Sequence, residues 1–444
     1  MPRQIVEPSR SIPVVIDAEV VVAGGGPGGL CAAVAAARAG ARVALIERYG
    51  FLGGMATAAL VNPFMPFHLD GEPMTRGIFE EWVDGMRRRG GYVDQSKWSR
   101  NIIEAEAAKA SALELCQKAG VQLMLHAFVD NVLLDESGSR IEYLCLAAKK
   151  RIAAAGRIFI DATGDADVAY LAGVPCDVGR EEDHAVQPMT LCFRMRGVDW
   201  SKMPQPGDKD ARAALNRLYD QAKQRGVIRC PRENMLYFGC VREDEIHFNQ
   251  TRVVGRNATD PCDLTAAEID ARDQVERFVA WLQAEIPAFK NAYLSETAPQ
   301  IGIRETRRIR GLYTLTGDDV LSARKFPDGI ARTDYPIDIH SPTGAGTVIK
   351  RLPAGEWYEI PYRCLVPQKL DNLLMACRAI SSDHVAHSSL RVMPPVAGLG
   401  EAAGTAAAMC LKKRCKPAEV SGEELVDKLI QQGQPLVRRR MADA

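Results

Sequence analysis

Three closely spaced glycines near the start of the sequence could hold a phosphate group. Gly24, Gly26 and Gly29 fit the pattern GxGxxG, and Pro27 and Gly28 complete the segment. In such a segment the first glycine makes a tight turn, the second lets the backbone approach a pyrophosphate, and the third lets a helix pack closely on a strand. The pattern alone is a weak signal, because glycine turns are common between strands and helices.

The residues around these glycines form the elements that must position them. EVVVAG before the turn predicts a buried strand, and CAAVAAARAG after it predicts a helix that ends at Gly40. RVALIE predicts a second strand that ends at Glu47, where a carboxylate can hydrogen-bond the ribose hydroxyls of a dinucleotide. The four features together predict a Rossmann-type dinucleotide-binding unit.

The loop after this acidic strand favours FAD over NAD. In a simple NAD enzyme the strand would lead into another crossover helix, whereas here FLGGMAT brings a second glycine pair that lets backbone N–H groups approach an extended cofactor. An ordinary loop is the alternative interpretation. The candidate cofactor contacts in this loop are Arg48, Gly53, Gly54, Met55, Ala56 and Thr57.

Four stretches of the sequence resemble a known family. They are residues 20–57, 157–174, 299–313 and 360–407. They resemble the glutathione-reductase-type flavoproteins, in the branch of FAD-dependent oxidoreductases that is distantly similar to the flavoprotein subunits of succinate dehydrogenase and fumarate reductase. The resemblance implies an FAD-dependent enzyme whose Rossmann-type domain binds the flavin.

The resemblance also implies cofactor contacts later in the chain. The additional candidates are Val129, Ala162, Thr163, Gly164 and Arg378. A helix that opens at Pro394 and Pro395 should point its N-terminus at the flavin pyrimidine ring, where its partial positive charge stabilises the reduced flavin. The family commonly has glycine where Cys377 stands, so the approach of the backbone to the flavin is expected to differ there.

Two further features limit the cofactor chemistry. No apolar strand ends at Gly398, so GLGEAAG is not a second nucleotide site, and the chain lacks the NAD(P)H domain of disulfide reductases. Family relatives that bind flavin covalently use a histidine in the loop where Met55 and Ala56 stand here, and His68 is the nearest histidine. We therefore expect non-covalent FAD.

Oxidation of a substrate by flavin requires a group that takes up a proton, and histidines are the natural candidates near neutral pH. His340, His384 and His387 lie in or near the flavin-binding stretches, and each could equally be structural. His340 is the first choice, because it follows an apolar alternation and precedes a Pro/Gly turn. His384 is the second.

The arginine-rich run GIRETRRIRG is a candidate for substrate binding. If it is a strand, Arg304, Arg308 and Arg310 face one side, with Glu305 and Arg307 on the other. An ion-pair ladder at a domain interface is one interpretation. The other is that Arg304 binds a substrate carboxylate through a bidentate pair of hydrogen bonds, for which the planar guanidinium has the right geometry.

Composition bounds the remaining possibilities. The 444 residues predict an α/β fold with an FAD-binding domain in two parts, residues 1–184 and 361–444, and an inserted α+β substrate (cap) domain, residues 185–360.

With 56 basic and 56 acidic residues, attraction to nucleic acid is not expected. Scattered cysteines without a CxxC pair argue against a metal site, and no apolar run predicts a membrane span or signal peptide, so we expect a cytoplasmic protein.

The sequence thus predicts an FAD-dependent dehydrogenase or oxidase that moves a hydride between flavin N5 and a small polar molecule. The substrate and the electron acceptor are not identified, and a homo-oligomer remains open. A flavoprotein with non-redox chemistry, such as an isomerase or hydratase, and an NAD-linked dehydrogenase are the alternatives.

Overall fold

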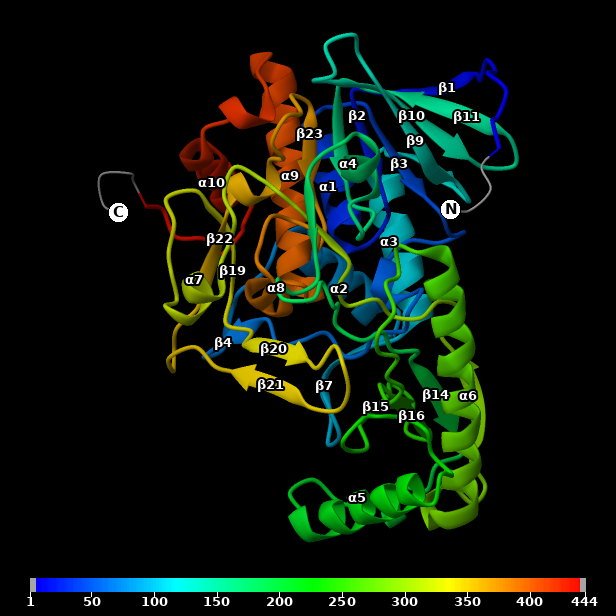
Figure 1. The fold of residues 1–444 in the computed structure, drawn as a ribbon. Helices are drawn as coiled ribbons and strands as arrows, with labels where there is room; N and C mark the ends of the chain where they lie inside the picture. Colours follow the sequence, from blue (N-terminus) through cyan, green and yellow to red (C-terminus); the bar gives the residue numbers. More distant parts are fainter. Residues whose placement is uncertain (1–4, 440–444) are drawn as a thin grey trace.

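The computed structural model describes residues 5–439, which form an α/β fold with two lobes (Figure 1). The upper lobe in Figure 1 is built around a five-stranded parallel sheet with the order β23-β12-β2-β3-β8. Its strands are β2 (Val20–Ala23), β3 (Val43–Glu47), β8 (Gln122–Leu125), β12 (Ile158–Asp161) and β23 (Leu373–Met375). Every residue of β2, β3, β12 and β23 is buried, as expected for parallel strands that are covered on both faces.

Helices α1 (Pro27–Arg38), α3 (Ala105–Lys118) and α9 (Met393–Lys413) pack against this sheet. The predicted strand, glycine turn, helix and acid-tipped strand are confirmed as β2, α1 and β3. Pro27 occupies the first turn of α1, where its missing N–H costs nothing, and Gly40 follows the helix with a φ of +96°.

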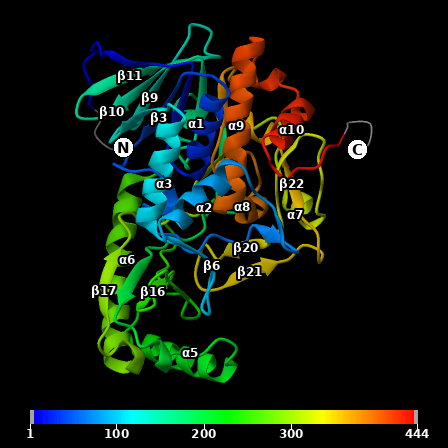
Figure 2. The same cartoon turned by 180° about the vertical axis from the view of Figure 1, so that it is seen from behind.

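Helices α1 and α9 lie side by side although they come from opposite ends of the chain (Figures 1 and 2). A Cβ atom on Gly400 of α9 would lie 2.0 Å from the carbonyl oxygen of Gly28, and one on Gly404 would lie 2.1 Å from that of Ala32. The glycines of GLGEAAG therefore serve close helix packing, which agrees with the prediction that this segment is no second nucleotide site.

A four-stranded sheet adds buried residues to the same core. Its strands are β1 (Val14–Asp17), β9 (Phe128–Leu134), β10 (Ile141–Ala147) and β11 (Arg151–Ala155). Shorter elements complete this lobe. They are the pairs β4 (His68–Leu69) with β5 (Glu72–Pro73) and β6 (Tyr92–Gln95) with β7 (Arg100–Ile103), and the helices α2 (Ile78–Arg88), α4 (Asp167–Leu171) and α10 (Gly422–Gln431).

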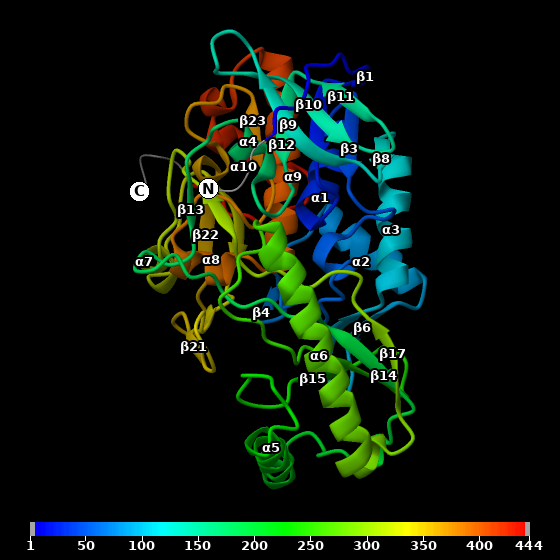
Figure 3. The same ribbon diagram turned by 45° about the vertical axis from the view of Figure 1, so that its right-hand side comes forward.

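The lower lobe has its own hydrophobic core and an antiparallel sheet with the order β15-β16-β14-β17. Its strands are β14 (Phe193–Arg196), β15 (Tyr237–Gly239), β16 (Glu245–Phe248) and β17 (Tyr293–Thr297). The long helix α6 (Pro261–Glu285) runs down the side of this lobe, and α5 (Lys209–Gln224) lies across its far end (Figure 3). This lobe thus contains both helices and an antiparallel sheet, all within the residues that were predicted to form the inserted α+β domain.

Several further short strand pairs and helices complete the structure. They are β13 (Cys176–Val178) with β18 (Arg307–Ile309), β19 (Gly329–Thr333) with β22 (Tyr358–Pro361), β20 (Ile337–His340) with β21 (Thr347–Lys350), and the helices α7 (Gly317–Leu321) and α8 (His384–Leu390). The buried residues from Ile309 onward join the core of the upper lobe, whereas the core of the lower lobe ends at Ile303. The cap boundary at residue 360 remains a prediction from the sequence. Within residues 5–439, no helix has both the length and the apolar character to cross a membrane.

Candidate functional site

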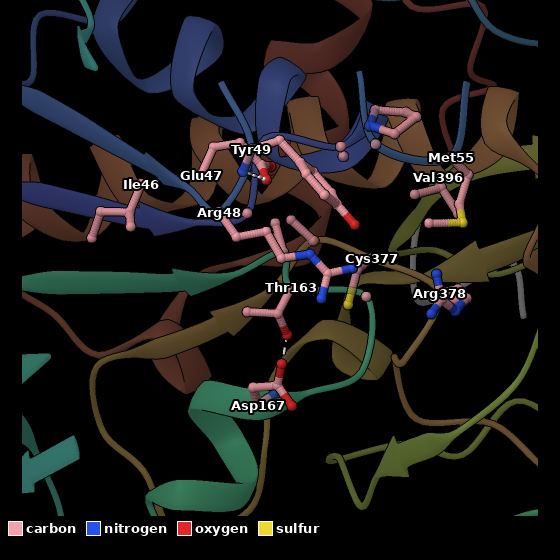
Figure 4. Close-up of a pocket in the computed structure, with 18 of the residues that line it drawn as sticks. Ile46, Glu47, Arg48, Tyr49, Met55, Thr163, Asp167, Cys377, Arg378 and Val396 are labelled. Atoms are coloured by element: carbon pink, nitrogen blue, oxygen red, sulfur yellow. Dashed lines mark hydrogen bonds between the residues drawn. The ribbon is translucent and has the colours of Figure 1, made fainter. Parts of the chain in front are cut away.

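The first cavity lies at the carboxyl ends of four parallel strands, β2, β3, β12 and β23, where open α/β sheets bind their ligands (Figure 4). Thirteen of the predicted cofactor contacts line it. They are Gly24, Gly26, Pro27, Gly28, Glu47, Arg48, Gly54, Met55, Val129, Ala162, Thr163, Gly164 and Arg378.

Backbone packing forms the wall of this cavity near the glycine turn. Gly24 has a φ of +104°, and a Cβ there would lie 2.2 Å from the carbonyl oxygen of Ala162. Gly26 caps α1, and only the Cα of Gly54, at 3.8 Å, lies near the position of its missing Cβ. The unsatisfied N–H groups of the first turn of α1 and the helix dipole favour a phosphate group at this point.

Glu47 closes the first cavity at the end of β3. Its Oε2 accepts a hydrogen bond from the N–H of Gly25 at 2.7 Å, and its Oε1 accepts one from the N–H of Tyr49 at 2.9 Å (Figure 4). Burial raises the pKa of this carboxyl above its usual range, although both N–H contacts oppose the shift. The carboxyl is held in place by the backbone and keeps lone pairs for ribose hydroxyls.

Four of the predicted contacts do not line the first cavity but shape its walls. A Cβ on Gly29 would lie 1.8 Å from the carbonyl oxygen of Gly24, so this glycine serves helix–strand packing. Gly53 donates its N–H to the carbonyl of Gly25 at 2.8 Å, and the hydroxyl of Thr57 donates to the carbonyl of Leu52 at 2.9 Å. Ala56 is buried in the short helix between them.

Several residues that line the first cavity were not among the predicted cofactor contacts, although Cys377 was expected beside the flavin. Tyr49 follows Glu47 directly, and Phe128 stands at the start of β9 with 45% of its surface exposed. Cys377 lines it too, and burial raises the pKa of its thiol to about 12, so the thiol is protonated at neutral pH. Burial, together with the neighbouring Asp165, raises the pKa of the lining Asp167 to about 6. The wall of the first cavity is formed by the ends of strands. Residues that neighbour the predicted contacts in the sequence therefore also lie along it.

A second cavity adjoins the first and lies between the two lobes. It is lined by Met55, Val61, Pro63, Met65, Thr190, Cys192, Asn249, Gly302, Ile303, Arg304, Tyr335, Asp338, His340, Arg378, Arg391, Val392 and Met393. Four residues belong to both cavities: Met55, Arg378, Arg391 and Met393. Because Met393 is the first residue of α9, this helix begins where the two cavities meet.

Arg304 is one of the charged groups of the second cavity. Its Nη1 donates to the carbonyl of Pro188 and to the hydroxyl of Thr190, both at 2.7 Å, and its Nη2 donates to the amide oxygen of Asn249 at 3.4 Å. Burial and the nearby guanidinium of Arg391 lower the pKa of Arg304 to about 9, which leaves it charged at neutral pH. Arg304 precedes the strand β18 (Arg307–Ile309), so the side-to-side alternation considered for a continuous strand from Arg304 to Arg310 does not apply.

Asp338 is the carboxylate of the second cavity, and the sequence analysis did not select it. The hydroxyl of Tyr335 donates to its Oδ2 at 2.9 Å, and Arg391 Nη2 lies 3.8 Å from the same oxygen. Burial opposes ionisation, but His340, Arg391 and Tyr335 together hold the pKa of Asp338 below its usual range. Its position two residues before His340 on β20 was a usable signal, because alternate residues of a strand share a face.

His340 lines the second cavity with both ring nitrogens engaged. Arg252 Nη2 lies 3.0 Å from Nδ1, and since arginine only donates, Nδ1 is an acceptor and the neutral ring carries its proton on Nε2. Nε2 lies 3.6 Å from Asp338 Oδ1. Burial and the charge of Arg304 lower the pKa of His340 to about 3, so the ring is neutral. These contacts do not favour His340 as the proton acceptor, because its lone pair points at Arg252.

The other two candidate histidines lie outside both cavities. His384 Nδ1 is 2.9 Å from Glu305 Oε1, and this buried glutamate also pairs with Arg308. His387 is completely buried, and its two ring nitrogens have no hydrogen-bond partner among residues 5–439. Part of the arginine-rich run therefore forms the ion pairs that one interpretation predicted. His68, the candidate for covalent attachment, is exposed on β4 and lines neither cavity.

The fold and the first cavity define a Rossmann-type nucleotide-binding protein. A family model described as FAD dependent oxidoreductase matches residues 19–429, and the chain therefore belongs to this family. FAD is its cofactor, and the first cavity fits that assignment because an unobstructed glycine turn, a helix N-terminus and Glu47 face it together. No curated protein matches the chain.

Solved structures show distant overall similarity. A geranylgeranyl bacteriochlorophyll reductase-like protein from Thermoplasma acidophilum is 13% identical, with a TM-score of 0.46 over 95% of this chain and 92% of that chain. The p-nitrophenol 4-monooxygenase PnpA from Pseudomonas putida is 12% identical, with a TM-score of 0.44 over 93% and 84% of the two chains. The myxobacterial halogenase CndH is 14% identical, with a TM-score of 0.46 over 93% and 78%.

Proposed function

We propose that this FAD-dependent oxidoreductase transfers a hydride between flavin N5 and a small polar organic molecule bound in the second cavity. The observation that carries the proposal is the shared wall of the two cavities, where Met55, Arg378, Arg391 and Met393 face both. A molecule in the second cavity therefore lies next to one end of a cofactor in the first. The finer resemblance to glutathione-reductase-type flavoproteins supports this arrangement and remains a prediction.

Bound FAD supplies an acceptor for the hydride that leaves a substrate C–H bond. The chain must then accept the proton of the adjacent O–H or N–H group, so that a double bond to carbon can form. We assign this proton to Asp338, because it is ionised and lines the second cavity. His340 orients this carboxylate through Nε2, and Arg304 binds a polar group of the substrate.

The proposal is tested by anaerobic mixing of the FAD-loaded protein with a panel of metabolites. A substrate should bleach the flavin absorbance at about 450 nm. Ile303→Trp should fill the second cavity, keep FAD bound and abolish bleaching, whereas Ile269→Trp, at an exposed position of α6, should leave it unchanged. Unchanged bleaching by Ile303→Trp would contradict the proposal.

A further inference from the structure

The second cavity holds one positive charge more than its own carboxylate neutralises. Asp338 and Arg391 face each other, and His340 is neutral. Arg378 has its own partner, because its Nη2 lies 2.6 Å from Asp165 Oδ1. These contacts leave one guanidinium of the cavity to account for.

That guanidinium belongs to Arg304. Among residues 5–439 no carboxylate lies within 4.0 Å of it, and its hydrogen bonds go to neutral oxygens of Pro188, Thr190 and Asn249. A partly buried cation without a counter-charge is costly unless a ligand supplies the negative charge. The contacts of Arg304 occupy Nη1 but leave its Nε without a hydrogen bond, so the group keeps a donor for a ligand.

The rest of the second cavity is lined by apolar and by polar residues. Val61, Pro63, Met65 and Ile303 come from the loop before β4 and from the segment before β18, and none of them offers a side-chain hydrogen bond. The polar lining includes the carboxylate of Asp338, to which the hydroxyl of Tyr335 donates a hydrogen bond. A ligand that matches this lining has an apolar group as well as charged and hydrogen-bonding groups.

We propose that the second cavity binds a monoanionic 2-hydroxycarboxylic acid with an apolar side group. The carboxylate pairs with Arg304, the hydroxyl donates to Asp338, and the apolar group lies along Val61, Met65 and Ile303. The inference rests on the proposed function for the identity of this cavity as the substrate site. The single negative charge of a monocarboxylate matches the positive charge of Arg304. A zwitterionic amino acid has no net charge, and a dicarboxylate has one negative charge more than the cavity can pair.

The test is calorimetric binding to the FAD-loaded protein, which requires no turnover. The probes are three acids paired with their own neutral amides: lactate and lactamide, mandelate and mandelamide, and 3-phenyllactate and its amide. We expect at least one acid to bind roughly 10-fold to 100-fold tighter than its amide, because the amide oxygen can still accept a hydrogen bond from Arg304 but carries no negative charge to pair with the guanidinium. Acids that bind no tighter than their amides would overturn the inference, and so would phenylalanine that binds tighter than 3-phenyllactate.

Substitutions then assign the preference to one residue. Arg304→Gln should remove the preference of acid over amide, and Arg304→Lys should retain part of it, because lysine keeps the charge but not the planar fork. Arg310→Gln is the matched control from the same run, since Arg310 is exposed and pairs with Asp177. FAD content and the thermal midpoint verify that each variant is folded. An Arg304→Gln variant that is folded and keeps the full preference would overturn the assignment.

The binding experiment and the flavin-bleaching experiment together distinguish a failure of this inference from a failure of the proposed function. If acids bind with the expected preference but no member of the metabolite panel bleaches the flavin, the proposed function fails and the charge match stands. If a neutral alcohol bleaches the flavin and no acid binds, the inference fails and the proposed function stands.

Discussion

The two cavities of this protein are built in different ways. The first cavity is made largely of backbone at the ends of parallel strands, and its predicted contacts come from short continuous segments. The second cavity is lined by side chains that lie far apart in the sequence, among them the charged residues Arg304, Asp338 and Arg391. A cofactor common to a family is thus held by chain geometry, whereas the proposed substrate site consists of side chains that can change without disturbing the sheet.

The two aspartates that line these cavities show the same contrast. Asp167 in the first cavity has a raised pKa because of burial and the neighbouring carboxylates Asp165 and Asp161. Asp338 in the second cavity has a lowered pKa, because its cationic and hydrogen-bonding neighbours outweigh burial. Substitutions that affect one cavity and leave the other intact therefore test the comparison.

The largest expected effect is on catalysis in the second cavity. Asp338→Asn should slow flavin reduction by substrate roughly 10²-fold to 10⁴-fold, because the amide cannot accept the proton, while FAD stays bound. His340→Ala should slow it less, since Asp338 remains. Stopped-flow absorbance measures both rates. A greater loss in His340→Ala than in Asp338→Asn would return the role of proton acceptor to His340.

The next effect concerns the glycine turn of the first cavity. Gly28→Ala should destabilise the fold by about 1 to 3 kcal/mol, because its Cβ would lie 1.9 Å from the carbonyl oxygen of Ala376. Gly26→Ala is the matched variant, since its Cβ meets no close protein atom, and it should lower FAD affinity while leaving the stability of the apoprotein unchanged. Thermal unfolding with and without FAD separates the two effects. Equal apoprotein stability in both variants would contradict this account.

A comparable effect on FAD affinity is expected at the end of β3. Glu47→Ala should weaken FAD binding by about 1.5 to 3 kcal/mol, because the ribose loses a charged acceptor, and Glu47→Gln should weaken it less. Titration of the apoprotein with FAD measures both, and Glu72→Gln on the short strand β5, outside both cavities, is the control. Equal affinity in the wild type and both variants would remove Glu47 from the cofactor site.

The smallest effect is a pH dependence from Asp167. Because its folded pKa of about 6 exceeds the usual value, the folded state binds the proton more tightly, and stability from this group falls as pH rises through about 6. Asp167→Asn cannot ionise, so its stability relative to the wild type should improve by about 1 to 2 kcal/mol from pH 4.5 to pH 7. Denaturant unfolding at both pH values measures the change. A constant difference between the two proteins would contradict the assignment.

The sequence pattern predicted the N-terminal part of the first cavity because its determinants are local, whereas the lining residues Val129, Ala162, Thr163, Gly164 and Arg378 were implied only by the family resemblance. GxGxxG, the adjacent strands and Glu47 lie within one βαβ unit. A position that has no room for a Cβ atom must be occupied by glycine, and the sequence shows this residue directly. It did not reveal that Gly53 and Thr57 brace the cavity wall through hydrogen bonds instead of lining it, because the direction of a loop side chain depends on tertiary contacts.

The second cavity was predicted only in part for the opposite reason. Arg304 and His340 were selected by residue type, and the structure brings them to one cavity. Asp338 was missed although it shares a strand with His340, and His384 was selected although Glu305 holds it outside both cavities. Sequence spacing shows which residues share a face, but not which face meets another lobe.

The contact of α1 with α9 has a consequence for how the protein is made. Residues 27–38 are synthesised before residues 393–413, whose glycines let the two helices touch. Until α9 has been made, the side of α1 that it covers is exposed on the nascent chain. The wall of the first cavity that α9 contributes is therefore complete only after this helix has been synthesised, and a chain that stops before α9 would present an apolar surface to chaperones and proteases.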